Sequence, residues 1–243
     1  MKKPLIIAHR GASAYAPENT EASFRLAVEM GADGIELDVH LSKDGIPVVI
    51  HDERLNRTGG RHGWVKDLTL AELKALDFGV WFKPEYAGQR IMTLEEVLIL
   101  LRDWSGLLNI ELKSGPVFYE GMEEKVVRLT YTYNRADTVI ISSFNHYSLL
   151  KVKEIDPRIK IGILYMAGLV APWEYAERLG AEAIHPLYYN IVPPIVAGCK
   201  AHGILVNPFT VDDPEHIKAI AAAGVDGIIT NVPDIAREII HKL

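Results

Sequence analysis

The fold is decided by the stretch Gly31-Ala32-Asp33-Gly34-Ile35-Glu36-Leu37-Asp38, which joins an amphipathic run to an alternating one. Gly31 follows residues 20–30 and suits the left-handed backbone conformation that commonly ends a helix. The alternation of apolar and acidic residues after it is typical of a strand that shows two different faces. The same joint returns at Gly180-Ala181-Glu182-Ala183-Ile184 and Gly224-Val225-Asp226-Gly227-Ile228. A joint that is used three times predicts a repeated helix-to-strand unit.

The remainder of the chain continues this alternation of strand-like and helix-like runs. Strands are predicted at residues 5–9, 34–41, 108–113, 138–144, 160–165, 183–186, 204–207 and 226–230. Helices are predicted at residues 20–30, 94–103, 119–133, 147–155, 173–179, 193–201, 214–223 and 233–241. Such alternation implies parallel strands connected by crossover helices. Eight pairs in 243 residues predict an α/β fold of the (βα)8 TIM-barrel type.

One segment departs from the repeat directly after Leu41. The connection Ser42-Lys43-Asp44-Gly45 is too short for a parallel crossover, so residues 46–52 must return as the second arm of an antiparallel hairpin. If Leu41 lies opposite Pro47, then His51 returns to the level of Leu37, between Glu36 and Asp38. The hairpin is therefore expected to deliver His51 to the same place as the two carboxylates.

Residues 52–92 form an insertion, so the barrel domain is predicted to comprise residues 1–51 and 93–243. Two capping boxes, Thr69 with Glu72 and Thr93 with Glu96, predict helix starts inside the insertion and just after it. The insertion is rich in aromatic residues, which we expect to form a small core of its own: Trp64, Phe78, Trp81, Phe82 and Tyr86. The residues alone therefore predict one barrel interrupted by an insertion after its second strand.

Composition narrows the classes of function. The chain is 49% hydrophobic and 24% charged, with a formal net charge of −6, which argues against a protein that follows a nucleic-acid backbone. Cys199 is the single cysteine, so neither an intramolecular disulfide nor a cysteine metal cluster can form. The first apolar run stops at His9 and Arg10, and no run approaches the ~20 apolar residues of a membrane span. We therefore expect a cytoplasmic protein that acts on a small molecule.

Acidic residues gather at the predicted carboxyl ends of strands, where barrel enzymes carry their active sites. Glu36 and Asp38 share one face of their strand, and Glu111 ends the next barrel strand. Three converging carboxylates favour a hard divalent cation, Mg²⁺ or Ca²⁺. The alternative is a buried ion pair of these acids with Arg10 or Lys113.

Two histidines are expected beside the cation. Imidazole titrates near neutral pH, so His9 and His51 could divide proton acceptance and donation between them. Arg10 and Lys113 are suited to binding a phosphate group. The other histidines are expected to be structural or exposed, with His185, also at a strand end, as the strongest exception: His40, His62, His146, His185, His202, His216 and His241.

Five motifs in order make the chain resemble the glycerophosphodiester phosphodiesterase family. They are His9-Arg10-Gly11, Pro17-Glu18-Asn19-Thr20, Glu36-Leu37-Asp38-Val39, His51-Asp52 and Glu111-Leu112-Lys113, and the match extends to the closing Gly227-Ile228-Ile229-Thr230. The resemblance implies a distorted TIM barrel with a small inserted subdomain. The resemblance implies hydrolysis of glycerophosphodiesters, such as glycerophosphocholine and glycerophosphoethanolamine, to sn-glycerol 3-phosphate and an alcohol. It also implies that Glu36, Asp38 and Glu111 bind one metal ion, that His9 and His51 are the acid/base pair, and that Arg10 and Lys113 contact phosphate.

Two positions depart from the family pattern. Family members commonly have a tryptophan near residues 207–210, where this chain offers Phe209 as a substrate-pocket residue. The last strand commonly ends in Thr-Asp, and here it ends in Thr230-Asn231. The resemblance suggests that the glycerol 2-hydroxyl attacks first to give a cyclic phosphate, but the sequence leaves direct attack by water open, together with the order in which the histidines act.

Three other functions compete with this prediction. The first is a related barrel phosphodiesterase acting on lysophospholipids, which would need an apolar groove or interfacial patch; no exposed amphipathic helix rich in Trp or Leu is evident. The second is a metal-dependent lyase or aldolase on the same fold. The third is a binding protein on a barrel that has lost catalysis, although all seven chemically active positions are present.

Overall fold

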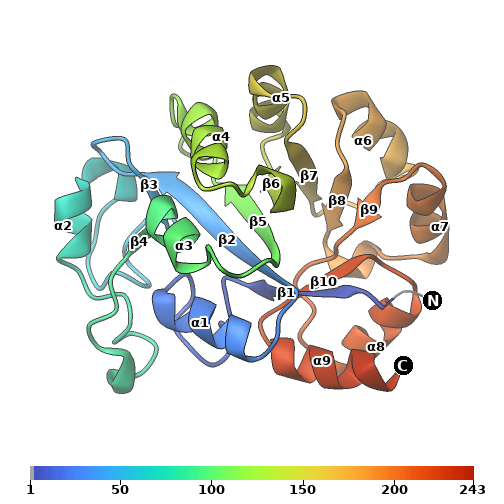
Figure 1. The fold of residues 1–243 in the computed structure, drawn as a ribbon, viewed down its shortest axis with the longest axis horizontal. Coiled ribbons are helices and arrows are strands. Elements are labelled where there is room, and N and C mark those ends of the chain that lie inside the picture. The colour runs from blue at the N-terminus through green and yellow to red at the C-terminus, as the bar shows by residue number, and fades with distance from the viewer. Residues whose placement is uncertain (1–2) are drawn as a thin grey trace.

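Eight parallel strands enclose a barrel, and helices surround it, in the computed structural model of residues 3–243 (Figure 1). The strands are β1 (Leu5–His9), β2 (Gly34–Leu41), β3 (Pro47–Val49), β4 (Met92–Thr93), β5 (Leu107–Leu112), β6 (Val139–Ser143), β7 (Lys160–Tyr165), β8 (Ala183–Pro186), β9 (Leu205–Val206) and β10 (Gly227–Thr230). All but β3 and β4 belong to the barrel, in the order β10-β1-β2-β5-β6-β7-β8-β9. Backbone hydrogen bonds from Asp226 to Val206 and from Ile229 to Pro208 close it between β9 and β10.

Each barrel strand is followed by a helix, as predicted, although β2 reaches its helix only after the hairpin and insertion. The α-helices are α1 (Glu21–Glu29), α2 (Leu70–Lys74), α3 (Leu94–Leu100), α4 (Met122–Thr132), α5 (His146–Ile155), α6 (Pro172–Leu179), α7 (Pro193–Ala201), α8 (Pro214–Ala222) and α9 (Pro233–Lys242). Single 3-10 turns occur at Val65–Asp67, Pro84–Tyr86, Ala136–Thr138 and Tyr188–Asn190. The distorted TIM barrel is confirmed, with β9 reduced to two residues.

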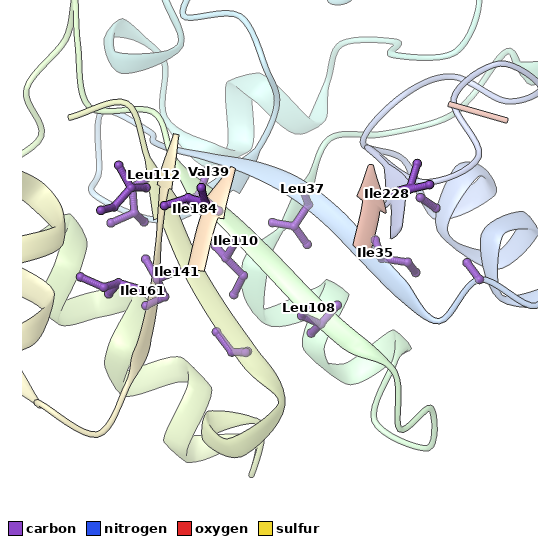
Figure 2. Packing of buried hydrophobic residues seen from close by; sticks show 14 of the residues in the cluster. Ile35, Leu37, Val39, Leu108, Ile110, Leu112, Ile141, Ile161, Ile184 and Ile228 are labelled. Carbon is purple, nitrogen blue, oxygen red and sulfur yellow. The ribbon is translucent and has the colours of Figure 1, made fainter. Parts of the chain in front are cut away.

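The barrel is held to its helices by an aliphatic layer on the outer face of the strands. Figure 2 shows Ile35, Leu37 and Val39 of β2 in this layer with Leu108, Ile110 and Leu112 of β5. All six side chains are buried, and each fully buried side chain of this size contributes roughly 1.5–3 kcal/mol relative to an exposed one. Because strand side chains alternate, the residues between them face the inside of the barrel. Those inner residues are Glu36 and Asp38 on β2 and Asn109 and Glu111 on β5.

The repeated joint has the conformation that its glycines predict. Gly31, Gly180 and Gly224 have φ values of +74°, +67° and +83°, in the left-handed region. The acidic residue two positions later accepts a hydrogen bond from a backbone N–H of a neighbouring strand: Asp33 from Ile6, Glu182 from Ile161 and Asp226 from Val206, each at 2.9 Å. In each repeat the glycine therefore ends a helix, and the acidic residue fixes the start of the adjacent strand.

The predicted hairpin and its register are confirmed. β3 pairs antiparallel with β2, with Leu41 opposite Pro47 and Val39 opposite Val49, and the Ile50 N–H donates to the carbonyl of Asp38. The sequence did not predict β4, which adds to β3 as a further antiparallel strand. His51 therefore follows a strand that is paired along both edges.

The inserted segment, with α2 and β4 at one side of the barrel in Figure 1, has a separate hydrophobic cluster. Of the aromatic residues expected in this core, only Phe78 is buried. Aliphatic side chains fill the cluster instead: Val48, Ile50, Leu55, Val65, Leu68, Leu73 and Ile91. Trp64, Trp81, Phe82 and Tyr86 are half-buried on its surface, with the Trp81–Phe82 and Phe82–Tyr86 ring centroids 5.7 Å apart. Both capping boxes are present.

No helix within residues 3–243 has both the length and the apolar character needed to cross a bilayer.

Candidate active site

A cavity of about 120 Å³ opens at the carboxyl ends of the barrel strands and brings the predicted residues together. Six of the seven residues predicted for the metal, acid/base and phosphate roles line it: His9, Arg10, Glu36, His51, Glu111 and Lys113. The seventh, Asp38, is completely buried beside them. A larger groove of about 650 Å³ lies elsewhere, near α1 and α3, and contains none of these residues.

Strand register places the three carboxylates side by side. β1 and β2 pair with His9 opposite Glu36, and β2 and β5 pair with Asp38 opposite Glu111. One carboxylate oxygen from each of Glu36, Asp38 and Glu111 lies within 4.8 Å of the others. Burial, together with the nearby charges of Asp38 and Glu111, raises the pKa of Glu36 well above its ordinary value. The three carboxylates therefore repel one another unless positive charge nearby offsets the repulsion.

Two cations partly compensate this cluster. The Arg10 guanidinium lies 3.4 Å from Asp38, and the Lys113 ammonium lies 3.5 Å from Asp38 and 2.8 Å from Glu111. Burial alone would raise the pKa of Asp38, but Lys113 and Arg10 bring it well below its usual range. The ion pairs that the sequence left open as the alternative to a metal site are therefore present: Asp38 pairs with Arg10 and Lys113, and Glu111 pairs with Lys113.

The donor set fits a hard divalent cation. Oδ1 of Asp38 is buried and has no hydrogen-bond partner, and the ammonium of Lys113 lies 3.5 Å from it, although a buried carboxylate oxygen is ordinarily hydrogen-bonded. Oδ2 of the same carboxylate accepts a 2.8 Å hydrogen bond from Asn19. Oxygen-only ligands from three carboxylates are what Mg²⁺ and Ca²⁺ prefer. An ion among Glu36, Asp38 and Glu111 would satisfy the free oxygen and offset the repulsion.

The two histidines are anchored in the same manner by different groups. Nδ1 of His9 lies 2.8 Å from Oδ1 of Asn231, and Nδ1 of His51 lies 2.7 Å from Oδ1 of Asp52. Each ring is therefore held at Nδ1, which leaves Nε2 for chemistry in the cavity. Nε2 of His9 lies 3.9 Å from Glu36. Burial, and then the charge of Arg10, lowers the pKa of His9 to about 4.

Arg57, from the insertion, connects both sides of the site. Its guanidinium donates to both oxygens of Glu18, each at 2.7 Å, and to both oxygens of Asp52, at 2.8 and 3.0 Å. Glu18 in turn accepts from Arg10 at 2.9 Å, while Asp52 holds His51. One arginine thus orders the carboxylates that position a phosphate-binding candidate and an acid/base candidate.

The backbone of Arg10 adopts an unusual conformation at the site. Its φ is +55°, which costs a non-glycine residue on the order of 1 kcal/mol. Three hydrogen bonds hold it: its N–H donates to Glu36 at 3.0 Å, and its carbonyl accepts from the Asn19 N–H and the Ser23 hydroxyl, each at 3.0 Å. The strained turn fixes the direction of the Arg10 side chain relative to the carboxylates.

The opposite wall of the cavity is apolar. Phe144, Leu164, Phe209 and Ile229 line it, and the rings of Phe144 and Phe209 meet edge to face with centroids 5.8 Å apart. Phe209 therefore lines the cavity, and its contact with substrate stays a prediction. The wall also contains Phe144, which the sequence analysis did not single out.

Of the remaining histidines, two are buried inside the barrel. The His40 ring lies 3.0 Å from the carbonyl of His51 and 2.9 Å from the Tyr119 hydroxyl, so it supports the backbone that carries His51. His185 is completely buried between the amides of Asn109 and Asn207, at 3.4 and 3.3 Å, and does not line the cavity. His185 is therefore a structural residue, although its position at a strand end had made it the strongest candidate for another role.

Several residues around the site escaped the sequence analysis. Asn19 and Asp52 stood inside quoted motifs without a role, and Arg57 and Asn231 were outside the predicted site. Their contacts join positions far apart in the chain: 19 residues for Asn19 and Asp38, and 222 for His9 and Asn231. Asn19 offers one local signal, its position next to a motif acid and before the helix-capping Thr20.

Comparisons with known proteins agree with this geometry. The model of the glycerophosphoryl diester phosphodiesterase family matches residues 9–235. A glycerophosphodiester phosphodiesterase of Caldanaerobacter subterraneus subsp. tengcongensis is 53% identical over 240 residues, covering 99% of both chains. A phosphodiesterase structure from Oleispira antarctica, in complex with the product sn-glycerol-3-phosphate, superposes with a TM-score of 0.90 at 35% identity, covering 98% of this chain and 97% of that one. A glycerophosphodiester phosphodiesterase structure from Agrobacterium tumefaciens gives 0.85 at 30% identity, with 97% and 99% coverage.

A barrel whose strand ends gather acids, histidines and cationic side chains, and which has such relatives, is a hydrolase of phosphoric diesters. The chain belongs to the glycerophosphoryl diester phosphodiesterase family, and its activity is that of a glycerophosphodiester phosphodiesterase.

Proposed function

We propose that the chain hydrolyses glycerophosphodiesters, such as glycerophosphocholine and glycerophosphoethanolamine, to sn-glycerol 3-phosphate and an alcohol, with one bound Mg²⁺ or Ca²⁺. The observation that carries the proposal is the pair of anchored imidazoles, His9 and His51, lining one small cavity with the carboxylate cluster. The product bound to the Oleispira antarctica phosphodiesterase supports the choice of sn-glycerol 3-phosphate.

The carboxylates would hold the cation and the basic residues would hold the phosphate. When bound to Glu36, Asp38 and Glu111, the cation supplies Lewis acidity and charge neutralisation to a phosphoryl oxygen. Arg10 and Lys113 both line the cavity, so they can bind the substrate phosphate without a large movement. A planar guanidinium binds a phosphate through two parallel hydrogen bonds, and an ammonium adds a compact positive charge.

The histidines would move the protons. Nε2 of one imidazole accepts the proton of the attacking hydroxyl, and Nε2 of the other donates a proton to the departing alcohol oxygen. Both rings already have Nδ1 occupied by side-chain acceptors, so Nε2 is the nitrogen available to substrate. The apolar wall with Phe209 and Phe144 contacts the carbon skeleton of the substrate.

The test is incubation with glycerophosphocholine, with and without EDTA, and measurement of sn-glycerol 3-phosphate released. We expect product only without EDTA, and recovery of activity when Mg²⁺ or Ca²⁺ is added back. Full activity in chelator-treated buffer would overturn the metal dependence, and no product with either cation would overturn the substrate class.

One feature favours lysophospholipids as a second class of substrate. Large apolar side chains stand exposed in, or directly after, the loops that follow β6, β7 and β8, and we call them the apolar rim: Phe144, Tyr147, Met166, Val170, Tyr189 and Val192. Val170 and Tyr147 are 97% and 83% exposed. Phe144 belongs to both the rim and the cavity wall, so the two surfaces are continuous. Apolar and aromatic side chains of this kind suit the boundary between lipid and water.

A comparison of glycerophosphocholine with lysophosphatidylcholine tests this second function. If the rim binds acyl chains, Val170→Asp with Met166→Asp should lower activity on lysophosphatidylcholine by about 10-fold or more and leave glycerophosphocholine hydrolysis within about twofold. Absence of any lysophosphatidylcholine hydrolysis by the unaltered protein would exclude the second function and leave the first intact.

A further inference from the structure

His9 is held by a chain of two further side chains. Oδ1 of Asn231, the residue after β10, lies 2.8 Å from Nδ1 of His9 and 2.6 Å from the Ser13 hydroxyl. Nδ2 of Asn231 donates to Oδ2 of Asp212 at 2.6 Å. Asn231 therefore lies between Asp212 and His9, and Asp212 does not line the cavity.

The chemistry of Asp212 determines which way round the Asn231 amide must lie. A carboxylate only accepts hydrogen bonds, so the amide group that faces it must be NH₂. The amide oxygen then faces His9. Because an oxygen cannot donate, Nδ1 of His9 has to carry the hydrogen, and the unprotonated nitrogen is Nε2.

Asp212 is fixed in its turn. Its other oxygen, Oδ1, accepts from the backbone N–H of Asn231 at 2.8 Å and from the Thr230 hydroxyl at 3.0 Å. A backbone N–H can only donate, so this position always needs an acceptor. If Asp212 is replaced by Asn, its oxygen stays on the backbone N–H of Asn231, and the group facing Nδ2 of Asn231 changes from an oxygen to NH₂.

We propose that Asp212 and Asn231 are positioning residues that set the tautomer of His9, with hydrogen on Nδ1 and a free lone pair on Nε2 directed to the reacting groups. This rests on the proposed function insofar as it needs His9 to act through Nε2. His51 obtains the same tautomer from Asp52 directly. The Thr-Asn ending of β10, where the family commonly has Thr-Asp, therefore takes on a definite role: a neutral amide that needs Asp212 to orient it.

The pair can be tested by exchanging its two members. In Asp212→Asn, the new NH₂ faces the NH₂ of Asn231, because the oxygen must stay on the backbone N–H. The Asn231 amide then rotates, presents NH₂ to Nδ1 of His9, and shifts the hydrogen to Nε2. In Asn231→Asp, two carboxylates face each other. The double variant Asp212→Asn/Asn231→Asp restores one donor and one acceptor.

Two readouts are needed. The first is the ¹⁵N spectrum of the His9 ring in the metal-free protein at about pH 8, where an ordinary imidazole is neutral, with the signal assigned by its loss in His9→Gln. The second is kcat on glycerophosphocholine. Incorrect tautomers of a catalytic histidine can cost up to ~10⁴-fold in serine proteases, and we expect a loss of about 10- to 10²-fold for Asp212→Asn because Asp212 is exposed and water can substitute in part.

The expected result is hydrogen on Nδ1 in the unaltered protein and in the double variant, hydrogen on Nε2 in Asp212→Asn, and kcat of the double variant within about threefold of the original. Asp213→Asn is the matched control, because Asp213 caps α8 and does not contact Asn231. An unchanged tautomer in Asp212→Asn would overturn this proposal alone. A shifted tautomer with unchanged kcat would support the role of Asp212 and Asn231 in setting the tautomer and would overturn the assignment of His9 to acid/base catalysis.

Discussion

The two halves of the barrel opening differ in chemistry. In the charged half, formed by β1, β2, β3 and β5, a cluster of ionic side chains surrounds the cavity, and every one of the seven predicted metal, acid/base and phosphate residues comes from it. In the uncharged half, formed by the loops after β6 to β9, residues 144–145, 166–171 and 187–192 contain no Asp, Glu, Lys, Arg or His. The loop at residues 207–213 carries such residues only at Asp212 and Asp213, which do not line the cavity. The seven candidate site residues and most of the apolar lining of the cavity therefore come from separate segments of one barrel.

The physical reason lies in strand register. Adjacent strands β1, β2 and β5 pair so that His9 lies opposite Glu36 and Asp38 opposite Glu111, which concentrates charge on three neighbouring strands. Concentrated charge is costly to bury unless the groups satisfy one another. The uncharged half supplies an apolar wall that excludes water from that cluster and strengthens its electrostatics.

The largest effect that would distinguish the halves comes from the carboxylates. Glu36→Gln, Asp38→Asn and Glu111→Gln should each lower kcat/KM on glycerophosphocholine by about 10³-fold or more, because a bound cation supplies several kcal/mol of transition-state stabilisation. Calorimetric titration should show weaker binding of Mg²⁺ or Ca²⁺ in each variant.

A matched change in the uncharged half is Tyr165→Phe, which removes a buried hydroxyl without a hydrogen-bond partner. It should leave kcat/KM within about twofold. A carboxylate variant with full activity in chelator-treated buffer would be removed from the ligand set.

The histidines should give the next largest effect. His9→Ala and His51→Ala should each lower kcat by ~10²–10⁴-fold, the usual contribution of a general acid or base. An activated diester, bis(p-nitrophenyl) phosphate, needs no proton on its leaving group, so it should restore much of the activity of one variant and not of the other. His216→Ala, next to Tyr188 in the uncharged half, should have little effect. Equal losses of both variants with both substrates would contradict a division of labour.

A smaller loss is expected from Arg57, which reaches the charged half from the insertion. Arg57→Ala removes the donors that hold Glu18 and Asp52, and it should lower kcat by about 10-fold while metal affinity changes little. Arg54→Ala is the control, because Arg54 stacks on Trp64, 4.1 Å from the ring centroid, and has no contact with these acids.

Trp81→Ala should change KM or leaving-group preference more than kcat, since Trp81 packs beside Arg57 and does not line the cavity. A complete loss of kcat in Trp81→Ala with unchanged folding would show that the insertion takes part in the chemistry.

The smallest effect on activity is expected for His185, the buried histidine beneath the uncharged half. Burial lowers its pKa to about 3, so the folded protein takes up this proton far below the pH at which the unfolded chain does, near 6.5. Because the unfolded state binds more protons between these values, stability should fall as pH drops from about 6.5 towards 3, by up to about 1.4 kcal/mol per pH unit.

In His185→Gln this slope should become shallower, while His40, whose pKa burial lowers to about 4, keeps part of it. Urea unfolding at several pH values measures the slope, and kcat at pH 7 should stay within about threefold. Identical slopes in both proteins would show that His185 is not buried in its neutral form.

Much of this arrangement could be predicted from the sequence because it depends on local periodicity. Alternating residues fixed the faces of β2 and β5, and the shortness of the Ser42–Gly45 connection fixed the hairpin. The contents of the insertion core were predicted wrongly, because burial of aromatics was inferred from their number and the cluster is filled by aliphatic side chains.

Contacts between distant parts of the chain could not be predicted from the sequence. Whether Asn231 meets His9, or Arg57 meets Glu18, depends on closure of the barrel and on the path of a loop. The strand β4 was missed since two residues carry no periodicity. The apolar rim could not be predicted from the sequence, because its members are distributed over separate loops and do not form one amphipathic helix.

The hairpin of β2 and β3 has a consequence for how this chain can change over time. His51 lies two residues beyond β3, so its place beside Glu36 and Asp38 depends on where the hairpin ends. Gain or loss of residues between Leu41 and Pro47 that shifted the pairing of β3 with β2 would move His51 along the barrel opening. Asp44 in the same turn also accepts a hydrogen bond from the first residue of α2, at 2.9 Å. Length variation among descendants should therefore be tolerated far better in the exposed loops of the insertion than in this turn.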